Sequence, residues 1–234
     1  GCAIGTRPVN LHLFALKKLG AKIKIKNGYI IAEAKNGLKG ANIFFPSISV
    51  GATENAILGA FNANGKTILN NCAIEPEIKD LIKFLNKLGG KIKIVGRKIL
   101  ITGLKKIKKS VEHEVIFDRI ELGTYMIACI LLAKNNIVIN KIDPRIIKSE
   151  IDILRKIGAQ ITKRKYSIIV RRSRKLKKLN ITTKPYPGFP TDLQAQLTIL
   201  LTQATGISKI KEEIFENRFM HVPELKRMGA NIEI

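Results

Sequence analysis

A short helical pattern followed by an alternation of apolar and polar residues recurs four times along the chain. The copies are LKKLGAKIKIKNGYIIAEA (16–34), LNKLGGKIKIVGRKILITG (85–103), LRKIGAQITKRKYSIIVRR (154–172) and the shorter LKRMGANIEI (225–234). Their glycines Gly20, Gly89, Gly158 and Gly229 are 69, 69 and 71 residues apart. We expect each glycine to end a helix in a left-handed conformation, which costs no Cβ clash, and each alternation to form a hairpin.

The segments before these copies also match one another. Short apolar runs that indicate strands occur at 66–71, 136–141 and 207–212, and helical spacing of apolar residues occurs at 52–61, 121–133 and 192–204. Glu75-Pro76 and Asp143-Pro144 each place an acid before a proline, as at the start of a helix. The predicted unit is therefore strand, helix, strand, helix and two strands. Two fairly complete copies are flanked by two partial ones.

A unit of this size predicts an α/β fold in which each copy forms a small layer of its own, rather than a turn of a short-period solenoid. Acidic residues follow a basic run in VEHEVIFDRIELG (111–123), and we place a domain boundary within this segment. The chain begins with Gly1 and ends within a strand-like run at Ile234, so we expect a piece of a longer protein.

The composition, with 45% hydrophobic and 26% charged residues, is that of a soluble globular protein. The longest apolar run, 125–133, is too short for a membrane span, and no export signal precedes it. The three cysteines Cys2, Cys72 and Cys129 show no CxxC spacing, so we expect neither a metal site nor disulfides, and a reducing cytoplasm. Cys72 and Cys129 are interpreted as structural.

The formal net charge of +24 raises the alternative of a nucleic-acid-binding protein. The basic runs LKKIKK (104–109) and RRSRKLKK (171–178) favour it, whereas the lack of tryptophan and the 6% of aromatic residues leave few platforms for base stacking. Lysine is spread over every segment, which is typical of a solvated surface. We therefore expect no nucleic-acid partner and no membrane partner.

The stretch PSISVGATEN (46–55) predicts a helix start with Gly51 just before it. Free N–H groups and the helix dipole at such an end attract anions, and a glycine lets a phosphate approach the backbone. The alternative is an ordinary helix start capped by Thr53.

The stretch PYPGFPTDLQAQ (185–196) is a stiff loop before a helix. Thr191 and Gln194 have the spacing of a capping box, which makes Asp192 a first-turn acid that favours the dipole. A carboxylate positioned on a shaped loop can instead serve as a general base.

Several other polar residues have simple structural interpretations. Glu75 is read as a helix-start acid, Asp118-Arg119 as an ion pair at the domain boundary, and His12 as a packed or surface histidine. FENRFMHVPEL (215–225) resembles a specific motif, but no single residue in it indicates a functional role.

Cys2 stands in GCAIGTRPVN, between glycines and close to Arg7. Alone it could be a small buried thiol. A nearby guanidinium would also stabilise a thiolate in an accessible loop, so a reactive cysteine is the second interpretation.

Taken in order, six motifs resemble those of the UDP-N-acetylglucosamine 1-carboxyvinyltransferases, also called UDP-GlcNAc enolpyruvyl transferases. The motifs are CAIGTRPVNLH, SVGATEN, EPEI, DRIELGT, PYPGFPTDLQAQ and FENRFMHVPELKRMGA, and they extend along all 234 residues. The resemblance implies an inverse α/β barrel of two domains, each built from three similar units. It also implies that residues 1–117 are the latter part of the first domain and residues 118–234 the first part of the second.

The activity implied by the resemblance is transfer of the enolpyruvyl group of phosphoenolpyruvate to the 3-hydroxyl of UDP-N-acetylglucosamine, with release of phosphate. This is the first committed step of peptidoglycan synthesis, and it uses two small-molecule substrates with no cofactor and no metal. Nothing in the resemblance requires an oligomer.

The resemblance also assigns residues. Cys2 is implied to be the proton donor and the residue alkylated by fosfomycin, and Asp192 binds the sugar hydroxyl as the candidate base. The residues implied to bind substrate, besides Asp192, are Arg7, Pro8, Val9, Asn10, Leu11, Ser47, Ile48, Ser49, Val50, Gly51 and Ile214.

The chain departs from the family pattern in two ways. Asn10 stands where the family usually has aspartate. The family's N-terminal Lys-Asn pair and further arginines lie outside these 234 residues, so we expect the fragment to be inactive alone. Two alternatives remain: a shikimate-type enolpyruvyl transferase of the same fold, which lacks this loop cysteine, and a non-catalytic basic repeat protein that binds nucleic acid.

Overall fold

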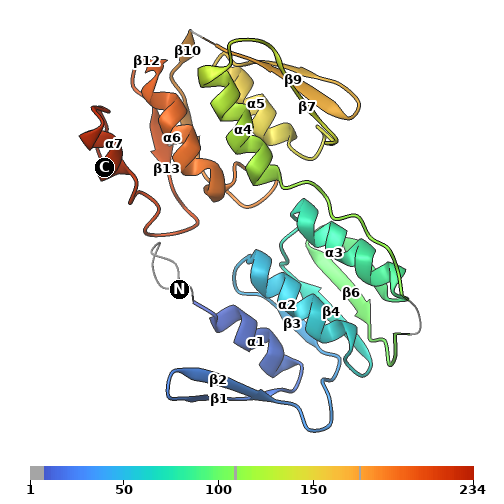
Figure 1. Ribbon diagram of the computed structural model, residues 1–234. Helices are drawn as coiled ribbons and strands as arrows, with labels where there is room; N and C mark the ends of the chain where they lie inside the picture. Colours follow the sequence, from blue (N-terminus) through green and yellow to red (C-terminus); the bar gives the residue numbers. More distant parts are fainter. Residues whose placement is uncertain (1–7, 108–109, 174) are drawn as a thin grey trace. The chain divides into compact units, whose positions relative to one another are not determined.

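The computed structural model describes residues 8–107, 110–173 and 175–234. The chain divides into two compact units, and the change from one to the other falls between Ile116 and Phe117. Figure 1 draws both units along the colour gradient, blue to green for the first and green to red for the second. The two units are described separately below.

The unit formed by residues 8–116 contains a helix and hairpin followed by one complete copy of the repeat. Its elements are α1 (Asn10–Lys18), β1 (Lys22–Lys26), β2 (Tyr29–Glu33), β3 (Asn42–Phe44), α2 (Val50–Phe61), β4 (Lys66–Asn70), α3 (Pro76–Lys87), β5 (Lys91–Val95) and β6 (Lys98–Thr102). β1 and β2 form an antiparallel hairpin. The other four strands form one sheet in the order β3-β4-β6-β5, with β3 parallel to β4 and β6 antiparallel to both of its neighbours.

The core of this unit lies between the four-stranded sheet and the helices. α3 begins at Pro76, where the fixed φ of proline suits the first helical position. Ile78, Ile82 and Leu85 of α3 are buried at helical spacing, and Ile99 and Ile101 alternate into the same core from β6. Apolar residues at the helical spacing of α3 and at every second position of β6 thus pack into one core, as the sequence pattern predicts.

The unit formed by residues 117–234 contains the other fairly complete copy of the repeat and the last, partial one. Its elements are α4 (Arg119–Leu132), β7 (Ile137–Asn140), α5 (Lys148–Lys156), β8 (Gln160–Lys163), β9 (Ser167–Arg171), β10 (Leu176–Lys177), β11 (Asn180–Thr182), the 3-10 helix η1 (Thr191–Leu193), α6 (Gln194–Thr202), β12 (Ala204–Thr205), β13 (Lys209–Lys211) and α7 (Val222–Arg227). The sheets are β7-β9-β8, β10-β12 and β11-β13. The helices α4, α5 and α6 lie together in Figure 1, and their apolar residues share one core.

The internal repeat is confirmed in three dimensions. The strand order β4-β6-β5 of one unit recurs as β7-β9-β8 in the other, with the same antiparallel pairing. The four predicted helix-ending glycines have φ values of 96°, 105°, 102° and 92°, in the order Gly20, Gly89, Gly158, Gly229. Each helix therefore closes with a left-handed residue that only glycine adopts without a steric cost.

Two expectations about the elements need correction. Asp143-Pro144 does not start a helix, because α5 begins at Lys148 and Asp143 instead accepts a hydrogen bond from the Arg145 N–H at 3.0 Å. The last alternating run, 231–234, is not a strand in this structure, although its equivalents β5 and β8 are. The described residues are mixed α/β with open sheets, and none of those sheets closes into a barrel.

Candidate active site

In the unit of residues 8–116, the start of α1 packs beside the start of α2. His12 Nδ1 lies 3.1 Å from Asn55 Nδ2, which joins the two helices. The other side of the imidazole faces Gly51, where an added Cβ would lie 3.1 Å from His12 Cε1. The segment 8–11, which is largely exposed, therefore runs into a helix whose first turn, at His12, is held against Gly51 and Asn55 of α2.

The N-terminus of α2 has an arrangement that differs from the one expected. Ser49, not Thr53, is the N-cap residue, and its Oγ accepts a hydrogen bond from the Ala52 N–H at 3.3 Å. Thr53 is buried within the helix, where its hydroxyl donates to the Ser49 carbonyl at 2.7 Å and accepts from the Ala73 N–H at 3.1 Å. Gly51 lies in the first turn rather than before the helix. A Thr53 cap is therefore wrong, because that side chain is already bonded inside the core.

Two backbone N–H groups at this helix start remain available. Ser49 engages the amides of Ala52 and Thr53, and the amides of Val50 and Gly51 have no acceptor among the residues that the structure describes. Both amides lie at the positive end of the helix dipole. Ser47 is exposed and Ile48, like Val50, packs partly on the core, so the segment presents backbone to solvent while its apolar side chains anchor it.

Acidic residues lie near the second turn of α2. Burial raises the pKa of Glu54, and the negative charges of Glu77 and Glu75 raise it further. Glu75 precedes α3 as the predicted helix-start acid and is buried. A phosphate at this helix start would therefore depend on backbone amides and on cations from other segments, rather than on the local side-chain charge.

In the unit of residues 117–234, Asp192 is held by an arginine from a distant loop. Arg218 Nη2 lies 2.5 Å from Asp192 Oδ1. The Asp192 side chain is half exposed and the Arg218 side chain is 17% exposed. The guanidinium also lies over the Phe215 ring, 5.0 Å from its centroid. Asp192 Oδ2 has no hydrogen-bond partner within the described part of the chain, so one carboxylate oxygen is free to accept a substrate hydroxyl.

Glu212 fixes the loop of Asp192 to the segment that carries Ile214. Its Oε2 accepts a hydrogen bond from the Thr191 hydroxyl at 2.9 Å. Its Oε1 accepts from the backbone N–H of Ile214 at 2.7 Å and of Phe215 at 3.2 Å. One carboxylate therefore ties together the two segments to which the family resemblance assigns sugar-nucleotide contacts.

The predicted capping box at Thr191 and Gln194 is wrong. Thr191 is the first residue of the 3-10 helix η1 (Thr191–Leu193) rather than an N-cap residue, and its hydroxyl donates a hydrogen bond to Glu212. Gln194 is 1% exposed, and its side-chain amide has no partner among the described residues. Asp192 lies in η1, directly before α6, and is free of any capping role.

His221 follows Arg218 in the same loop. Burial lowers the pKa of its imidazole, and a hydrogen bond with the Arg218 backbone offsets this in part. Its ring packs 6.4 Å from the Phe219 ring, measured between centroids. The loop that presents Arg218 to Asp192 therefore carries a histidine whose protonation is disfavoured by burial.

The structure describes two of the three cysteines, Cys72 and Cys129. Burial raises the pKa of the Cys72 thiol to about 12, despite the opposing effect of Arg97. Burial also raises the pKa of Cys129, and both thiols are free. They pack with the two cores, as predicted for structural cysteines. Cys2 and Arg7 lie outside the described residues.

The Asp118-Arg119 pair does not form as expected. Asp118 caps α4 by accepting hydrogen bonds from the N–H groups of Ile120 at 2.7 Å and Glu121 at 3.2 Å. Arg119 instead reaches Glu150, with Nη1 to Oε1 at 3.5 Å and both side chains buried. The Asp118 carboxylate therefore caps α4, and the Arg119 guanidinium pairs with Glu150 in the core of the same unit.

Two of these residues could not be assigned from sequence alone. Each joins segments that are far apart along the chain. His12 contacts Asn55, 43 residues away, and Glu212 contacts Thr191, 21 residues away. Their only sequence signal is a position next to a specific motif, His12 at the end of CAIGTRPVNLH and Glu212 just before FENR.

Residues 1–234 match the protein family described as EPSP synthase (3-phosphoshikimate 1-carboxyvinyltransferase). The chain therefore belongs to this family, whose members are enolpyruvyl transferases. Within the family it is similar to the UDP-N-acetylglucosamine 1-carboxyvinyltransferases of Pelagibacter ubique (57% identical over 235 residues) and Endomicrobium trichonymphae (51% identical over 235 residues). Both matches cover 100% of this chain and 56% of the relative, so the chain spans about half the length of the curated relatives it matches. The predicted resemblance is confirmed.

Solved structures confirm the fold class. The enolpyruvyl transferase NikO from Streptomyces tendae superposes with a TM-score of 0.84 at 23% identity, covering 94% of this chain and 55% of that chain. An EPSP synthase from Acinetobacter baumannii superposes with a TM-score of 0.66 at 20% identity, covering 90% and 49%. Across residues 8–107, 110–173 and 175–234, no helix has the length and apolar character needed to cross a membrane.

Proposed function

We propose that the complete protein transfers the enolpyruvyl group of phosphoenolpyruvate to the 3-hydroxyl of UDP-N-acetylglucosamine and releases phosphate. The observation that carries this proposal is the 57% identity, over the whole chain, to a relative named for that reaction. The product would enter peptidoglycan synthesis, and both substrates are small molecules. No cofactor is required by this chemistry.

The reaction is an addition followed by an elimination. The sugar 3-hydroxyl adds to C2 of phosphoenolpyruvate and gives up its proton, while the methylene carbon C3 takes a proton from an acid. The C2–O bond to phosphate then breaks, and C3 loses a proton as the new enol ether forms. The protein must therefore supply an acid at C3, a base at the hydroxyl, and donors for the phosphate and carboxylate oxygens.

The assigned residues suit these tasks. Cys2 is proposed as the acid, and Arg7, five residues further along the chain, as a phosphate ligand. Asp192 is proposed as the base, and its free Oδ2 supports this role. Arg218 then acts as a positioning residue, since it fixes the other carboxylate oxygen.

The nucleotide sugar is proposed to bind at two segments of the first unit and at Ile214 of the second. Pro8, Val9, Asn10 and Leu11 enter α1, and Ser47, Ile48, Ser49, Val50 and Gly51 enter α2. The free amides of Val50 and Gly51 support a phosphate contact there. Asn10 is the first residue of α1 and is exposed, so its amide is available to the nucleotide in place of the family's aspartate.

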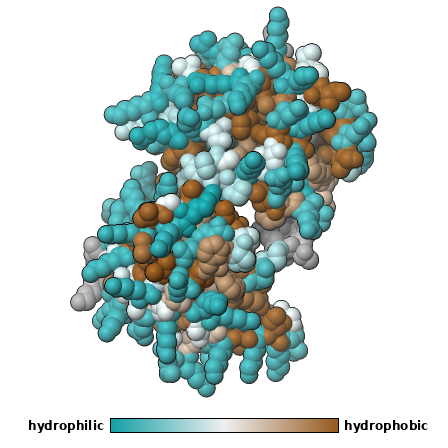
Figure 2. Space-filling model, turned by 180° about the vertical axis from the view of Figure 1, so that it is seen from behind, coloured by the Kyte–Doolittle hydropathy of each residue, from teal (hydrophilic) through white to brown (hydrophobic). Residues whose placement is uncertain are grey.

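The two alternatives predict different behaviour. A shikimate-type transferase would release phosphate from phosphoenolpyruvate with shikimate 3-phosphate but not with the nucleotide sugar. A passive nucleic-acid binder would bind DNA or RNA with a steep salt dependence and release no phosphate. Hydrophilic side chains cover most of the face drawn in Figure 2, with hydrophobic patches between them. We rank the nucleic-acid alternative last, because the relatives at 57% and 51% identity are named for an enzymatic reaction.

The test uses the complete gene product, because the 234 residues span 56% of the relatives. Phosphate release from phosphoenolpyruvate is measured with UDP-N-acetylglucosamine, and Cys2→Ser and Asp192→Ala are assayed beside the parent. We expect activity in the parent and its loss in both variants. Full activity in both variants, or none in the parent, would overturn the assigned roles.

We further propose that residues 1–117 and 118–234 are parts of two domains of the complete protein, and that it acts in the cytoplasm, where both cysteines of the cores stay reduced. Enzymatic cleavage between the domains, followed by separate folding assays, tests the first proposal. Fractionation of the source cells tests the second.

A further inference from the structure

The motif DRIELGT (118–124) spans the start of α4 but has no role in the reaction proposed above. Asp118 caps the helix, and Arg119 pairs with Glu150 in the core. Gly123 is buried in the second turn of the helix. Neither the cap nor the ion pair explains a glycine at this position, because glycine weakens the interior of a helix.

Gly123 lies directly against the last residue of η1. A Cβ added to Gly123 would clash with Leu193 Cδ1 and would lie 2.9 Å from Cδ2 and 3.2 Å from Cγ of the same side chain. Leu193 is 1% exposed and belongs to the core that α4, α5 and α6 share, so its side chain has no free space to turn into. The missing side chain at Gly123 therefore allows η1 to pack on α4.

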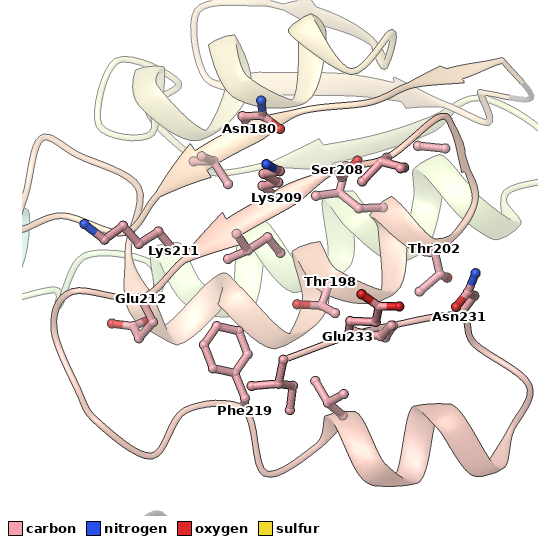
Figure 3. Close-up of a pocket in the computed structure, with 18 of the residues that line it drawn as sticks. Asn180, Thr198, Thr202, Ser208, Lys209, Lys211, Glu212, Phe219, Asn231 and Glu233 are labelled. Atoms are coloured by element: carbon pink, nitrogen blue, oxygen red, sulfur yellow. The ribbon is translucent and has the colours of Figure 1, made fainter.

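The residue on the other side of Asp192 is fixed by a different segment. The Thr191 hydroxyl donates to Glu212 at 2.9 Å. Figure 3 shows the groove that Glu212 and Thr198 line, with Glu212 where the chain leaves β13 and Thr198 on α6, the helix that follows η1. Because η1 is only three residues long, contacts at its first and last residues leave the backbone of the middle residue little freedom.

The start of α4 also supports the loop before η1. Arg119 lies one turn before Gly123 on the same face of the helix, and its guanidinium lies over the Tyr186 ring, 5.8 Å from the centroid. The Tyr186 hydroxyl donates to the Ile146 carbonyl at 3.3 Å. The loop that leads to η1 and η1 itself are thus both held by residues of the motif DRIELGT.

We propose that Gly123 is a positioning residue for Asp192. By admitting Leu193 against α4, it determines where η1 presents the carboxylate to the sugar hydroxyl. This inference rests on the proposed function, in which Asp192 is the base. A proton acceptor that works in one defined geometry loses rate when it is displaced by about 1 Å. The competing explanation is a small residue at an ordinary packing contact, whose replacement lowers stability and leaves the rate of the folded enzyme unchanged.

The test uses the complete protein and separates rate from stability. Gly123→Ala should lower kcat by about 100-fold, because the new Cβ displaces Leu193 and η1 with it. KM for phosphoenolpyruvate should stay at the parent value, because none of the residues assigned to that substrate lies in η1. Ile130→Ala is the matched control. Ile130 is fully buried near the other end of α4, so its truncation should lower the thermal stability but not kcat of the folded enzyme.

A change on the other side of the contact gives two further measurements. Leu193→Ala removes the atoms that the new Cβ would meet, so its addition to Gly123→Ala should raise kcat again. Leu193→Ala alone removes the contact without a clash and should lower kcat by about 10-fold, which tests the contact even where Gly123→Ala does not fold. In the Asp192→Ala background, Gly123→Ala should cause no further loss, since it acts only through that carboxylate.

The outcomes distinguish this inference from the proposed function. An active parent, an inactive Asp192→Ala and a Gly123→Ala with the parental kcat would overturn the positioning role alone. Equal losses of kcat in Gly123→Ala and Ile130→Ala, or a further loss in the Asp192→Ala background, would leave Gly123 with a packing role only. No phosphate release by the parent, or full release by Asp192→Ala, would overturn the proposed function and this inference with it.

Discussion

Arg218 Nη2 approaches Asp192 Oδ1 to 2.5 Å, across 26 residues of sequence, and leaves Oδ2 of the same carboxylate open. The pair joins the two motifs of the second unit, PTD and FENR, through a charge-assisted hydrogen bond. It orients the carboxylate of a half-exposed side chain that would otherwise rotate freely. The contact therefore links a loop motif without an evident role to the candidate base.

Loss of the Arg218–Asp192 contact should lower the catalytic rate constant, kcat. Asp192→Ala is expected to lower kcat of the complete enzyme by about 10²–10⁴. Arg218→Ala is expected to lower kcat by about 10–100-fold, since a carboxylate displaced by about 1 Å loses that much. Arg218→Lys keeps the charge and should recover part of the loss. Steady-state kinetics of these variants and of the double variant check the link.

The double variant separates positioning from independent binding. If Arg218 acts only through Asp192, Arg218→Ala combined with Asp192→Ala should be no worse than Asp192→Ala alone. Losses that multiply would show that Arg218 acts on the substrate directly and would contradict the positioning role.

Glu212 should matter for both stability and nucleotide-sugar binding. Glu212→Ala leaves the Thr191 hydroxyl and two backbone amides without their acceptor, which is expected to cost about 1–3 kcal/mol in unfolding free energy. It should also raise KM for the nucleotide sugar, because Ile214 loses its anchor. Urea unfolding and kinetics measure the two effects. Glu213→Ala is the matched control, since the Glu213 side chain forms its ion pair with exposed Lys211 and should change neither quantity.

The elements that the sequence predicted correctly depend on local physics. A left-handed glycine after a helix, followed by an alternation, requires only a few neighbouring residues, and all four copies show it in the turn glycines. Buried positions such as Ile99 and Ile101 follow from the same alternation. These features are encoded at short range, so one chain without relatives is sufficient to predict them.

The parts that could not be predicted depend on partners that are distant in sequence. The capping box failed because Thr191 lies inside η1 rather than at an N-cap, with its hydroxyl donating to Glu212, which the fold brings from beyond β13. The Thr53 cap failed because Ala73, from after β4, donates to that hydroxyl. In both cases the polar side chain is held by a contact with a segment that is distant in sequence. Propensity rules describe only local contacts and do not reveal this one.

Gly51 offers a test of the α2 start with a control in the same helix. Gly51→Ala places a Cβ 3.1 Å from His12 Cε1, beside the free amides proposed to hold phosphate. Because the new methyl group blocks close approach to that backbone, KM for the nucleotide sugar should rise by about 10-fold. Gly59→Ala has the same clearance, 3.1 Å to Leu19 Cδ1, but faces the core. It should leave KM unchanged.

Thermal unfolding of both glycine variants checks that a loss of stability does not cause the difference in KM. Alanine is the better helix former by about 1 kcal/mol, so neither variant should be strongly destabilised. A KM increase in Gly59→Ala as large as that in Gly51→Ala would mean that α2 as a whole, rather than its first turn, is disturbed.

The described thiols should resist alkylation. With its pKa raised to about 12, Cys72 is almost entirely protonated at pH 7.5, and burial also disfavours the thiolate of Cys129. Fosfomycin is therefore expected to label Cys2 alone in the complete protein with its substrate present. Peptide mapping by mass spectrometry identifies the labelled cysteine, and label on Cys72 or Cys129 would contradict the assignment.

The loop that carries Arg218 should weaken in acid through His221. Burial lowers the pKa of this imidazole in the folded state, whereas in the unfolded chain its pKa is near the ordinary value of 6.5. The unfolded state therefore binds more protons between the two pKa values, so the contribution of His221 to stability is present above about pH 6.5 and declines as the pH falls through the folded pKa. Because Arg218 shares this loop, the hold on Asp192 should loosen over the same range.

Comparison of wild type with His221→Phe isolates this effect from the carboxylates, which titrate in both proteins. Unfolding free energies from urea melts at pH 7.5, 6.5 and 5.5 should fall more steeply for the wild type than for His221→Phe. Asn217→Ala, two positions before Phe219 in the same loop, carries no titratable group and should keep the wild-type slope. Parallel slopes in wild type and His221→Phe would show that the buried imidazole does not set the acid response of this loop.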